Sequence, residues 1–305
     1  MIKKFIITDE FVNSRLDRWF RRKIFDIPQS LLEKSIRKGY IKVNNKKEIS
    51  SYKLKLQDKI NVYELKLIAN KHKIKNIPYQ PTKNEISFSS TLFIENNDNF
   101  AVINKPAGIS VQSGTKSKRN ILDMLKSSKE FLEAYPYTVH RIDKETTGVL
   151  IVAKNRKYAQ LFTSLFRIRK IHKVYLGIII GDTIKNKGTL VDNLFHYEGK
   201  KKVITKAVTH FSVLDTNGRL SLLQLKPETG RKHQIRKQLL LRGCPIYGDS
   251  KYRITDYYSK EKNNLMLHAY KIGFSINDVR YNFTAELPII FKKFLKEKYL
   301  KTSLL

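Results

Sequence analysis

The sequence predicts an α+β fold, with a mixed, mainly antiparallel sheet flanked by helices. Apolar runs of strand length recur along the chain, as in GVLIVAK (residues 148–154), KVYLGIIIG (173–181) and SLLQLKP (221–227). Only a few helical patterns lie between these runs. The 305 residues are 41% apolar, which is enough for a proper core and for one large domain or two smaller ones.

The first segment begins with two predicted helices. In SRLDRWFRRKIF (14–25), Ser14 is placed to cap a helix with one apolar stripe, made of Leu16, Trp19, Phe20 and Phe25. A second short helix, LLEKSIRKGY (31–40), is closed by Gly39. Basic side chains remain on the other faces of both helices, so this segment is strongly cationic.

Two strand pairs are predicted after these helices. IKVNNKKEI (41–49) has the pattern of a strand, turn and strand around Asn44 and Asn45, and LKLQDKINVYEL (54–65) of another pair around Asp58. The order of elements resembles the S-four type of RNA-binding domain (the alpha-L motif), in which two short helices pack on a small sheet. The resemblance implies an RNA-binding domain over 11–67, with RNA contacts from Arg18, Arg21, Arg22, Arg37 and Lys38. A small basic segment with ordinary solvated charges is the alternative.

Residues 68–90 contain two prolines and no clean period, so a linker is predicted there. The remainder, 91–305, is the predicted larger domain. It opens with a strand pair around Asn97 and Asp98 and contains a helical pattern at 233–243. The C-terminal FKKFLKEKYLKT (291–302) is expected to be an amphipathic helix covering the sheet.

The formal net charge of +33 is the strongest compositional signal. It predicts attraction to a polyanion, first of all nucleic acid and secondly an anionic membrane surface. The single cysteine, Cys244, excludes an intramolecular disulfide, and no Cys/His spacing for structural zinc occurs. No run has the roughly 20 apolar residues of a membrane span, and no secretory signal is recognisable. We therefore expect a cytoplasmic protein.

Three stretches have the composition of functional sites. NKPAGISVQSG (104–114) makes a sharp turn after a strand and places Lys105 at its edge. VHRIDKETTG (139–148) places Asp143 in a polar turn before a buried strand, with Arg141 on the same side of the chain. A nearby arginine favours the ionised carboxylate that a nucleophile requires, although a structural salt bridge fits equally well.

The third stretch, residues 225–249, turns at Gly230 into a helix predicted to start near Arg231. His233 and Arg236 then lie on one helical face. Four basic side chains in the first two turns oppose the helix dipole, unless anions bind there. This conflict with a local rule suggests a functional role.

Together these stretches resemble the RluA family of pseudouridine synthases. Its HRLDxxTSG motif corresponds to HRIDKETTG here, its GRxHQIR motif to GRKHQIR, and its KPxG and KxY motifs to KPAG and KVY. The resemblance spans about residues 93–252. With the S-four type domain in front, it favours the branch that modifies large-subunit ribosomal RNA. The sequence departs from the family at Ile142, Thr147, Gln112 and the Lys237–Gln238 pair.

The resemblance implies a role for each matching residue. Asp143 occupies the position of the essential aspartate, and Tyr175 that of a tyrosine packed against the target base. Arg236, or alternatively Arg231, pairs with the aspartate. Arg141 helps to displace the target nucleotide. Further RNA contacts are expected from Lys105, Arg231 and His233.

The implied reaction turns a uridine into pseudouridine and needs neither metal nor other cofactor. Two alternatives remain: a ribosome-assembly protein without catalysis, and a carboxylate-dependent glycosidase with Glu145 or Glu228 as proton donor. The sequence leaves open whether Asp143 attacks the ribose or removes its carbon-2 proton. It also leaves open which uridines are modified, in free RNA or an assembling subunit. We expect a monomer bound to ribosomal RNA or a ribosome precursor.

Overall fold

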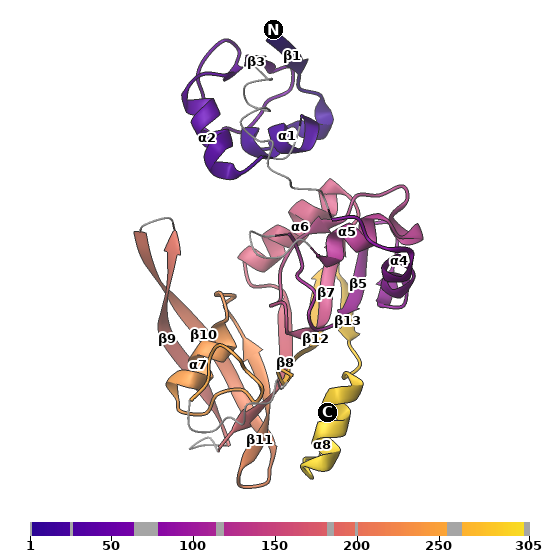
Figure 1. The fold of residues 1–305 in the computed structure, drawn as a ribbon, viewed down its shortest axis with the longest axis vertical. Coiled ribbons are helices and arrows are strands. Elements are labelled where there is room, and N and C mark those ends of the chain that lie inside the picture. The colour runs from indigo at the N-terminus through magenta and orange to yellow at the C-terminus, as the bar shows by residue number, and fades with distance from the viewer. Residues whose placement is uncertain are drawn as a thin grey trace. The chain divides into compact units, whose positions relative to one another are not determined.

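The computed structural model describes residues 2–24, 27–63, 79–113, 119–181, 186–198, 201–254 and 264–301. The chain divides into two compact units, Met1–Ile77 and Pro78–Leu305 (Figure 1). Each unit has its own hydrophobic core.

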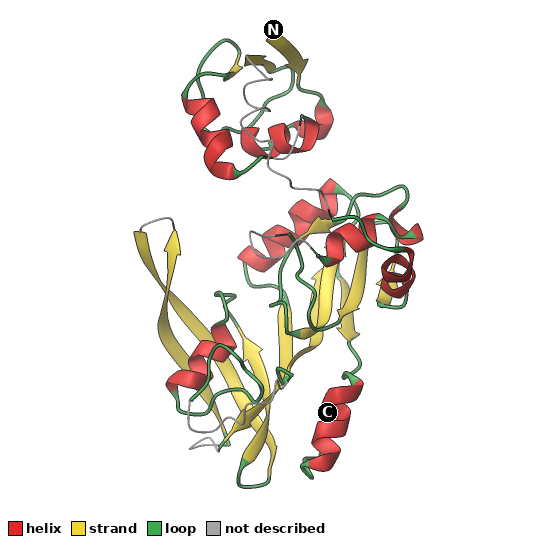
Figure 2. Cartoon of the chain, in the orientation of Figure 1, coloured by secondary structure: helices red, strands yellow, loops and turns green. Residues whose placement is uncertain are grey.

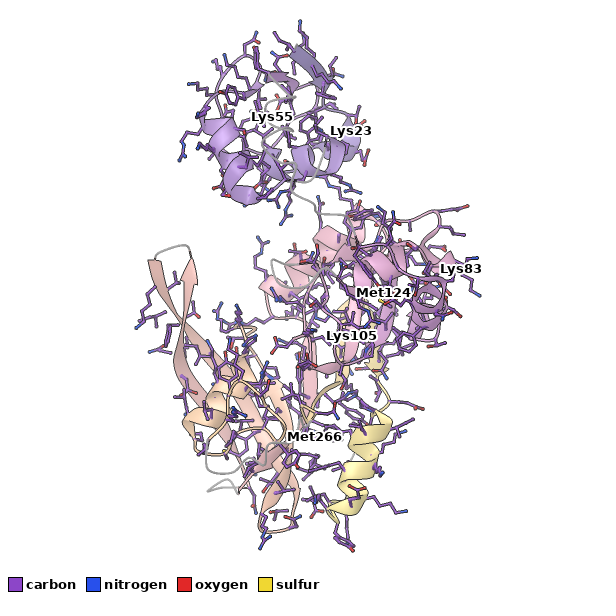
Figure 3. The ribbon with its side chains drawn as sticks, viewed as in Figure 1. Lys23, Lys55, Lys83, Lys105, Met124 and Met266 are labelled. Atoms are coloured by element: carbon purple, nitrogen blue, oxygen red, sulfur yellow. The ribbon has the colours of Figure 1, made fainter. Side chains whose placement is uncertain are left out.

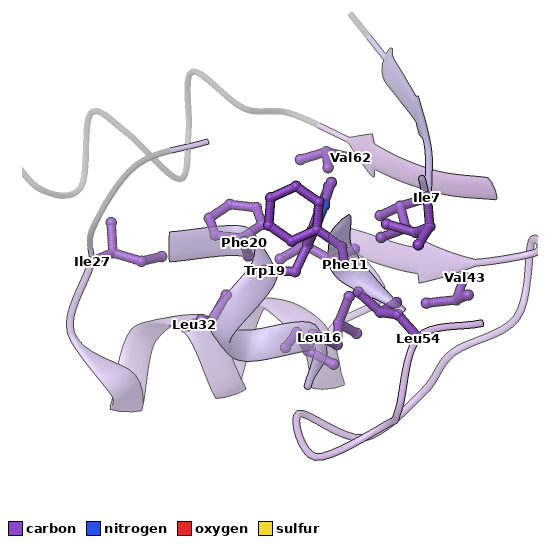
Figure 4. Packing of buried hydrophobic residues seen from close by; sticks show 13 residues of the cluster. Ile7, Phe11, Leu16, Trp19, Phe20, Ile27, Leu32, Val43, Leu54 and Val62 are labelled. Carbon is purple, nitrogen blue, oxygen red and sulfur yellow. The ribbon is translucent and has the colours of Figure 1, made fainter. Parts of the chain in front are cut away.

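The first unit packs two helices on a three-stranded antiparallel sheet of order β1-β3-β2. Its elements are β1 (Ile2–Ile6), η1 (Asp9–Phe11), α1 (Leu16–Lys23), α2 (Gln29–Arg37), β2 (Ile41–Val43) and β3 (Lys59–Tyr63). The stripe predicted on the first helix is buried at Leu16, Trp19 and Phe20 (Figure 4), while Phe25 lies outside the described residues. Gly39 has a positive φ of 79°, as expected after a helix C-terminus.

Several details of this unit differ from the prediction. Its first strand, β1, lies before residue 11, where the domain was predicted to begin, and it pairs with β3. Arg15 rather than Ser14 is the residue before helix α1, because Ser14 N–H bonds back to the preceding 3-10 turn. The predicted second strand after Asn45 is only a bridge between Val43 and Lys46, because β3 already pairs with both β1 and β2.

The second unit contains a ten-stranded sheet with the main order β4-β5-β7-β12-β8-β11-β10-β9, with β13 beside β12 and β6 beside β7. Figure 2 shows the strands in yellow and the helices in red. The strands are β4 (Phe93–Asn96), β5 (Phe100–Lys105), β6 (Tyr137–Thr138), β7 (Thr147–Ala153), β8 (His172–Ile180), β9 (Lys187–Glu198), β10 (Lys201–Thr216), β11 (Leu220–Pro227), β12 (Leu267–Ile276) and β13 (Val279–Thr284). All pairs are antiparallel except that of β12 with β7. The mixed, mainly antiparallel sheet is therefore confirmed.

The helices of this unit are α4 (Lys83–Ser90), α5 (Ile121–Lys126), η2 (Lys129–Phe131), α6 (Arg156–Arg167), α7 (Gln234–Leu241) and α8 (Ile289–Glu297). Helices α5 and α6 cover opposite faces of β5 and β7, because alternate residues of β7 enter two different core clusters. On α8, Phe291 and Leu295 pack against β8 and β11, as expected for the C-terminal helix.

Helix α4 changes the predicted linker of residues 68–90. Thr82 and Glu85 form a capping box at its start, and the helix lies against α5. Residues 83–90 thus belong to the second unit, and residues 64–78 lie outside the described part of the chain.

The parallel pair of β12 and β7 requires glycine at one position. Gly148 has a φ of 108°, and a Cβ there would lie 2.2 Å from the carbonyl oxygen of Ala269. Only glycine allows this approach of two backbones. The strand that follows Asp143 is thereby fixed in the centre of the sheet.

Candidate active site

Asp143 lies in the loop that leads directly into β7. Thr146 N–H donates to the Asp143 carbonyl at 3.1 Å, which closes the turn, and every residue of β7 is buried. The Asp143 side chain is 21% exposed. A carboxylate is thus held at the surface of a cleft by a rigid strand.

Arg236 binds this carboxylate from helix α7. Its Nη1 lies 3.0 Å from Asp143 Oδ2, while Nε and Nη2 lie 2.6 and 2.7 Å from the two oxygens of Asp249. Asp249 is fully buried, and the Arg236 side chain is 8% exposed. The alternative partner, Arg231, is exposed and donates instead to the Lys206 carbonyl, 3.1 Å away. The geometry therefore pairs Arg236 with Asp143.

The two carboxylates determine the electrostatics of Arg236. Burial alone would lower the pKa of Arg236, but hydrogen bonds and charges from Asp249 and Asp143 outweigh burial and raise this pKa. The Tyr252 ring covers the guanidinium, with 5.0 Å between the guanidinium carbon and the ring centroid. Arg236 is therefore a permanent, oriented cation beside Asp143.

Tyr175 lines the same cleft from strand β8 and is partly buried. Burial, and secondly the negative charge of Asp143, raise the pKa of the Tyr175 hydroxyl well above its usual value. Tyr175 is therefore a neutral phenol at physiological pH. Two residues earlier, burial lowers the pKa of Lys173 to about 8.

His233 precedes helix α7 in a left-handed conformation, with φ 54° and ψ 34°. The helix starts at Gln234, later than predicted, because the Gln234 side chain accepts from Arg231 N–H and Thr229 and folds residues 229–233 into a turn. Arg231 and His233 therefore lie before the helix rather than in its first turn. Fewer basic side chains therefore lie in the first turns of the helix than predicted, and their unfavourable interaction with the helix dipole is smaller.

Lys105 differs most from its expected role. It was predicted to contact RNA, yet it is 0% exposed, and its ammonium donates to the carbonyls of Pro106, Ile109 and Lys144 at 2.6, 3.0 and 3.1 Å. Figure 3 labels the position of Lys105 in the second unit. Burial lowers its pKa to about 7, against the opposing charges of Glu145 and Asp143. Lys105 joins the KPAG turn to the loop that carries Asp143, and its amine is enclosed by the protein.

The cleft has a volume of about 650 Å³ and a strongly basic lining. Asp143, Tyr175 and Arg236 meet in it, together with the exposed Arg141. Its further basic lining residues are Arg167, Arg169, Lys173, Arg231 and Lys232. Arg167, Arg169 and Lys173 were not predicted to line the site. The two arginines belong to no recognised motif, and Lys173, although it is the lysine of the KVY motif, was given no role.

Two further residues that complete the site, Asp249 and Tyr252, were also missed. They lie in the stretch PIYGDSKY (245–252), at the C-terminal end of the range covered by the resemblance, and no role was predicted for them. Of the two candidate proton donors of a glycosidase, Glu145 is exposed. Glu228 lines the cleft and is bound to His210 at 2.6 Å.

The predicted RNA contacts of the first unit lie on its two helices. Arg18, Arg22, Arg37 and Lys38 are exposed, and Arg21 is partly buried. Within the described ranges, no helix is long and apolar enough to cross a membrane. Among the same residues, no group of three or more His, Cys, Asp or Glu is placed to hold a metal ion.

Comparison with known proteins gives concordant matches. A family model described as RNA pseudouridylate synthase matches residues 99–241. The "Ribosomal large subunit pseudouridine synthase C" of Buchnera aphidicola subsp. Baizongia pistaciae is 32% identical over 308 residues, which cover 95% of each chain. The protein of the same name from Rickettsia bellii is 32% identical over 92% of this chain and 97% of its own. A solved structure, "Human RNA Pseudouridylate Synthase Domain Containing 4", aligns with a TM-score of 0.62 and 27% identity, over 72% of this chain and 98% of its own.

Proposed function

This chain belongs to the RNA pseudouridylate synthase family, and we propose that it isomerises specific uridines of large-subunit ribosomal RNA to pseudouridine. The names of its relatives from Buchnera and Rickettsia support the choice of RNA. The observation that carries the proposal is the contact between Asp143 and Arg236, at 3.0 Å in a basic cleft.

We assign the essential carboxylate to Asp143. Isomerisation breaks the bond between uracil N1 and ribose C1′ and joins C1′ to uracil C5. A carboxylate beside the ribose can add to C1′ or take the proton of C2′, and Arg236 keeps it ionised and oriented for either step. Because Asp249 binds the other edge of Arg236, the guanidinium cannot rotate away from Asp143.

We assign Tyr175 to packing against the target uracil. Its ring stands beside Asp143 in the cleft and remains a neutral phenol, which suits stacking on an uncharged base. The target nucleotide must leave its stack to reach Asp143, at a cost of a few kcal/mol. Arg141 and the basic lining of the cleft offset part of that cost through phosphate contacts.

We assign RNA binding to the first unit. We also propose that the protein is a monomer and acts in the cytoplasm. Exposed arginines on α1 and α2 give this unit the charge of an RNA-binding surface. Replacing Arg18 and Arg22 together by glutamine should weaken ribosomal RNA binding. The slope of log affinity against log salt concentration should become shallower by the equivalent of about two phosphate contacts. An unchanged affinity and salt slope would contradict this role.

The decisive experiment is pseudouridine mapping of ribosomal RNA incubated with the protein. The wild type should modify a small set of large-subunit uridines, whereas Asp143→Asn should modify none and bind RNA with nearly unchanged affinity. Asp98→Asn, in the exposed turn between β4 and β5, is the matched control and should retain activity. Wild-type activity in Asp143→Asn would refute the catalytic assignment, and absence of wild-type modification would favour an assembly protein.

A further inference from the structure

His233 joins the carboxylate of Asp143 to a second side chain, Tyr252. Its Nε2 lies 3.7 Å from Asp143 Oδ1, and its Nδ1 lies 2.8 Å from the Tyr252 hydroxyl. The three groups form one line from the reacting carboxylate to a partly exposed phenol. Neither the pairing of Asp143 with Arg236 nor RNA binding requires this arrangement of Asp143, His233 and Tyr252.

The backbone at His233 is held in an uncommon conformation to make this arrangement. A left-handed φ of 54° is uncommon outside glycine, although histidine, like asparagine and aspartate, adopts it more often than other residues do. The turn is fixed by Gln234, whose side-chain amide donates to Val208 O and Thr209 Oγ1 on strand β10. Backbone strain maintained by surrounding bonds is concentrated at functional sites.

The hydrogen of neutral His233 is assigned to Nδ1, the nitrogen that faces the Tyr252 hydroxyl. The distance of 3.7 Å between Nε2 and Asp143 Oδ1 is longer than a hydrogen bond in the free protein, and catalytic contacts of this kind commonly shorten to hydrogen bonds when substrate binds. An unprotonated Nε2 facing the carboxylate fits this distance, and Nδ1–H then donates to the Tyr252 oxygen at 2.8 Å. The Tyr252 O–H remains available to water.

We propose that His233 and Tyr252 form a proton relay that carries the uracil C5 proton from Asp143 to solvent. This inference rests on the proposed function. Once C5 is bonded to C1′, its C–H bond must break, and uracil N1 gains a proton from water. In the relay, Asp143 takes the C5 proton and passes it to His233 Nε2. His233 Nδ1–H is then transferred to the Tyr252 oxygen, and the original Tyr252 proton passes to water, which leaves Asp143 ionised again.

The surroundings of His233 suit this transfer. Burial lowers the pKa of His233 to about 4, with Asp143 opposing this change and Arg236, Lys251 and Lys232 adding to it. A pKa this far below the ordinary value of an imidazole means that His233 holds an acquired proton only weakly and passes it on readily. Tyr252 is held over Arg236, which fixes its hydroxyl beside His233.

The first test removes one hydroxyl. Tyr252→Phe keeps the ring on Arg236 and should leave RNA affinity and unfolding unchanged, while kcat for pseudouridine formation falls about 10²-fold. In mixtures of light and heavy water, the wild-type rate should show a curved proton inventory, and that of Tyr252→Phe a linear one. Tyr247→Phe, whose ring packs against Phe294 away from the cleft lining, is the control and should behave as wild type.

The second test replaces the imidazole. His233→Gly suits the left-handed backbone and leaves space for an added base. Its slow turnover should be restored by free imidazoles in proportion to their basicity. Pyrazole, similar in shape but a far weaker base, should restore none.

The outcomes separate this inference from the proposed function. A wild-type protein that forms no pseudouridine refutes the function itself. An active wild type whose rate and proton inventory are matched by Tyr252→Phe refutes the relay alone. Equal rescue of His233→Gly by imidazole and pyrazole also refutes it, because the imidazole then only fills space.

Discussion

Two buried cations, Lys105 and Arg236, fix the position of Asp143, one through the backbone and one through the side chain. Lys105 binds the backbone carbonyl of Lys144, the next residue in the chain, and Arg236 binds the Asp143 carboxylate itself. Both side chains are almost removed from solvent. Their pKa values nevertheless move in opposite directions, down to about 7 for Lys105 and upward for Arg236.

The difference lies in what faces each cation. Lys105 has three neutral carbonyls, and two acidic groups influence it only through their charge. Arg236 contacts two carboxylates directly, and these more than compensate for burial. A buried cation that contacts only dipoles serves to hold backbone together, whereas one that contacts carboxylates serves to orient charge.

The largest effect is expected from Arg236→Met. It leaves Asp249 as a buried, unpaired charge and releases Asp143, so the free energy of unfolding should fall by about 3–5 kcal/mol. Pseudouridine formation should fall at least about 10³-fold. Denaturant titration and single-turnover kinetics measure the two losses. Arg242→Met, which breaks a pair with 40% of the arginine side chain exposed, should cost no more than about 1 kcal/mol.

Lys105→Met should reduce stability with no direct loss of RNA contacts. Three buried carbonyls lose their donor, which predicts a loss of about 3 kcal/mol in the free energy of unfolding. At a temperature where the variant is folded, its affinity for RNA should equal that of wild type. Lys144→Met, with an exposed side chain, is the control. Weaker RNA binding at unchanged stability would instead support the role predicted from sequence.

The pH dependence of stability should distinguish the two cations. The folded pKa of Lys105 is about 7, below the ordinary 10.5, so between these values the unfolded state binds more protons. Stability should therefore increase with pH above 7, by up to about 1.4 kcal/mol per unit from this group. Between pH 7 and 8 the slope should disappear in Lys105→Met, whereas above pH 8 a slope of the same sign remains from Lys173, whose pKa burial lowers to about 8. Arg236, with its raised pKa, contributes no slope in this range, and an unchanged slope between pH 7 and 8 in Lys105→Met would contradict the assignment.

The smallest effect is expected from His210→Gln. His210 contacts Glu228 at 2.6 Å, but both side chains are nearly half exposed and water screens their interaction. Unfolding free energy should change by less than about 0.5 kcal/mol. A larger change would show that direct contact with a carboxylate stabilises even without burial.

The sequence predicted the elements whose signal is local. The hairpin around Asn97, the buried strand after Gly148 and the helix before Gly243 all follow from periodicity and turn residues. Strand partners were not predictable in the same way, because β12 lies between β7 and β8 through contacts distant in sequence. Helix α4 was missed because its hydrophobic pattern is weak, although Thr82 and Glu85 have the spacing of a capping box.

Within the site, motif matching located Asp143, Tyr175 and Arg236, which the fold brings into one cleft. It did not distinguish a cation that reaches solvent from one enclosed by backbone, as Lys105 demonstrates. Burial depends on the loops that close over a residue, and composition contains no such information. The choice between Arg231 and Arg236 also required the position of the helix start.

The parallel pairing of β12 with β7 has a consequence for folding during synthesis. Strand β12 begins more than a hundred residues after β7 ends, yet it lies between β7 and β8 in the sheet. Until a ribosome has released residues up to about 276, strand β7, which follows the Asp143 loop, lacks one neighbour, and β8 lacks the same one. Such distant pairing slows folding and leaves strand edges exposed for longer. The nascent chain should therefore acquire its active site only after strand β12 has been released from the ribosome.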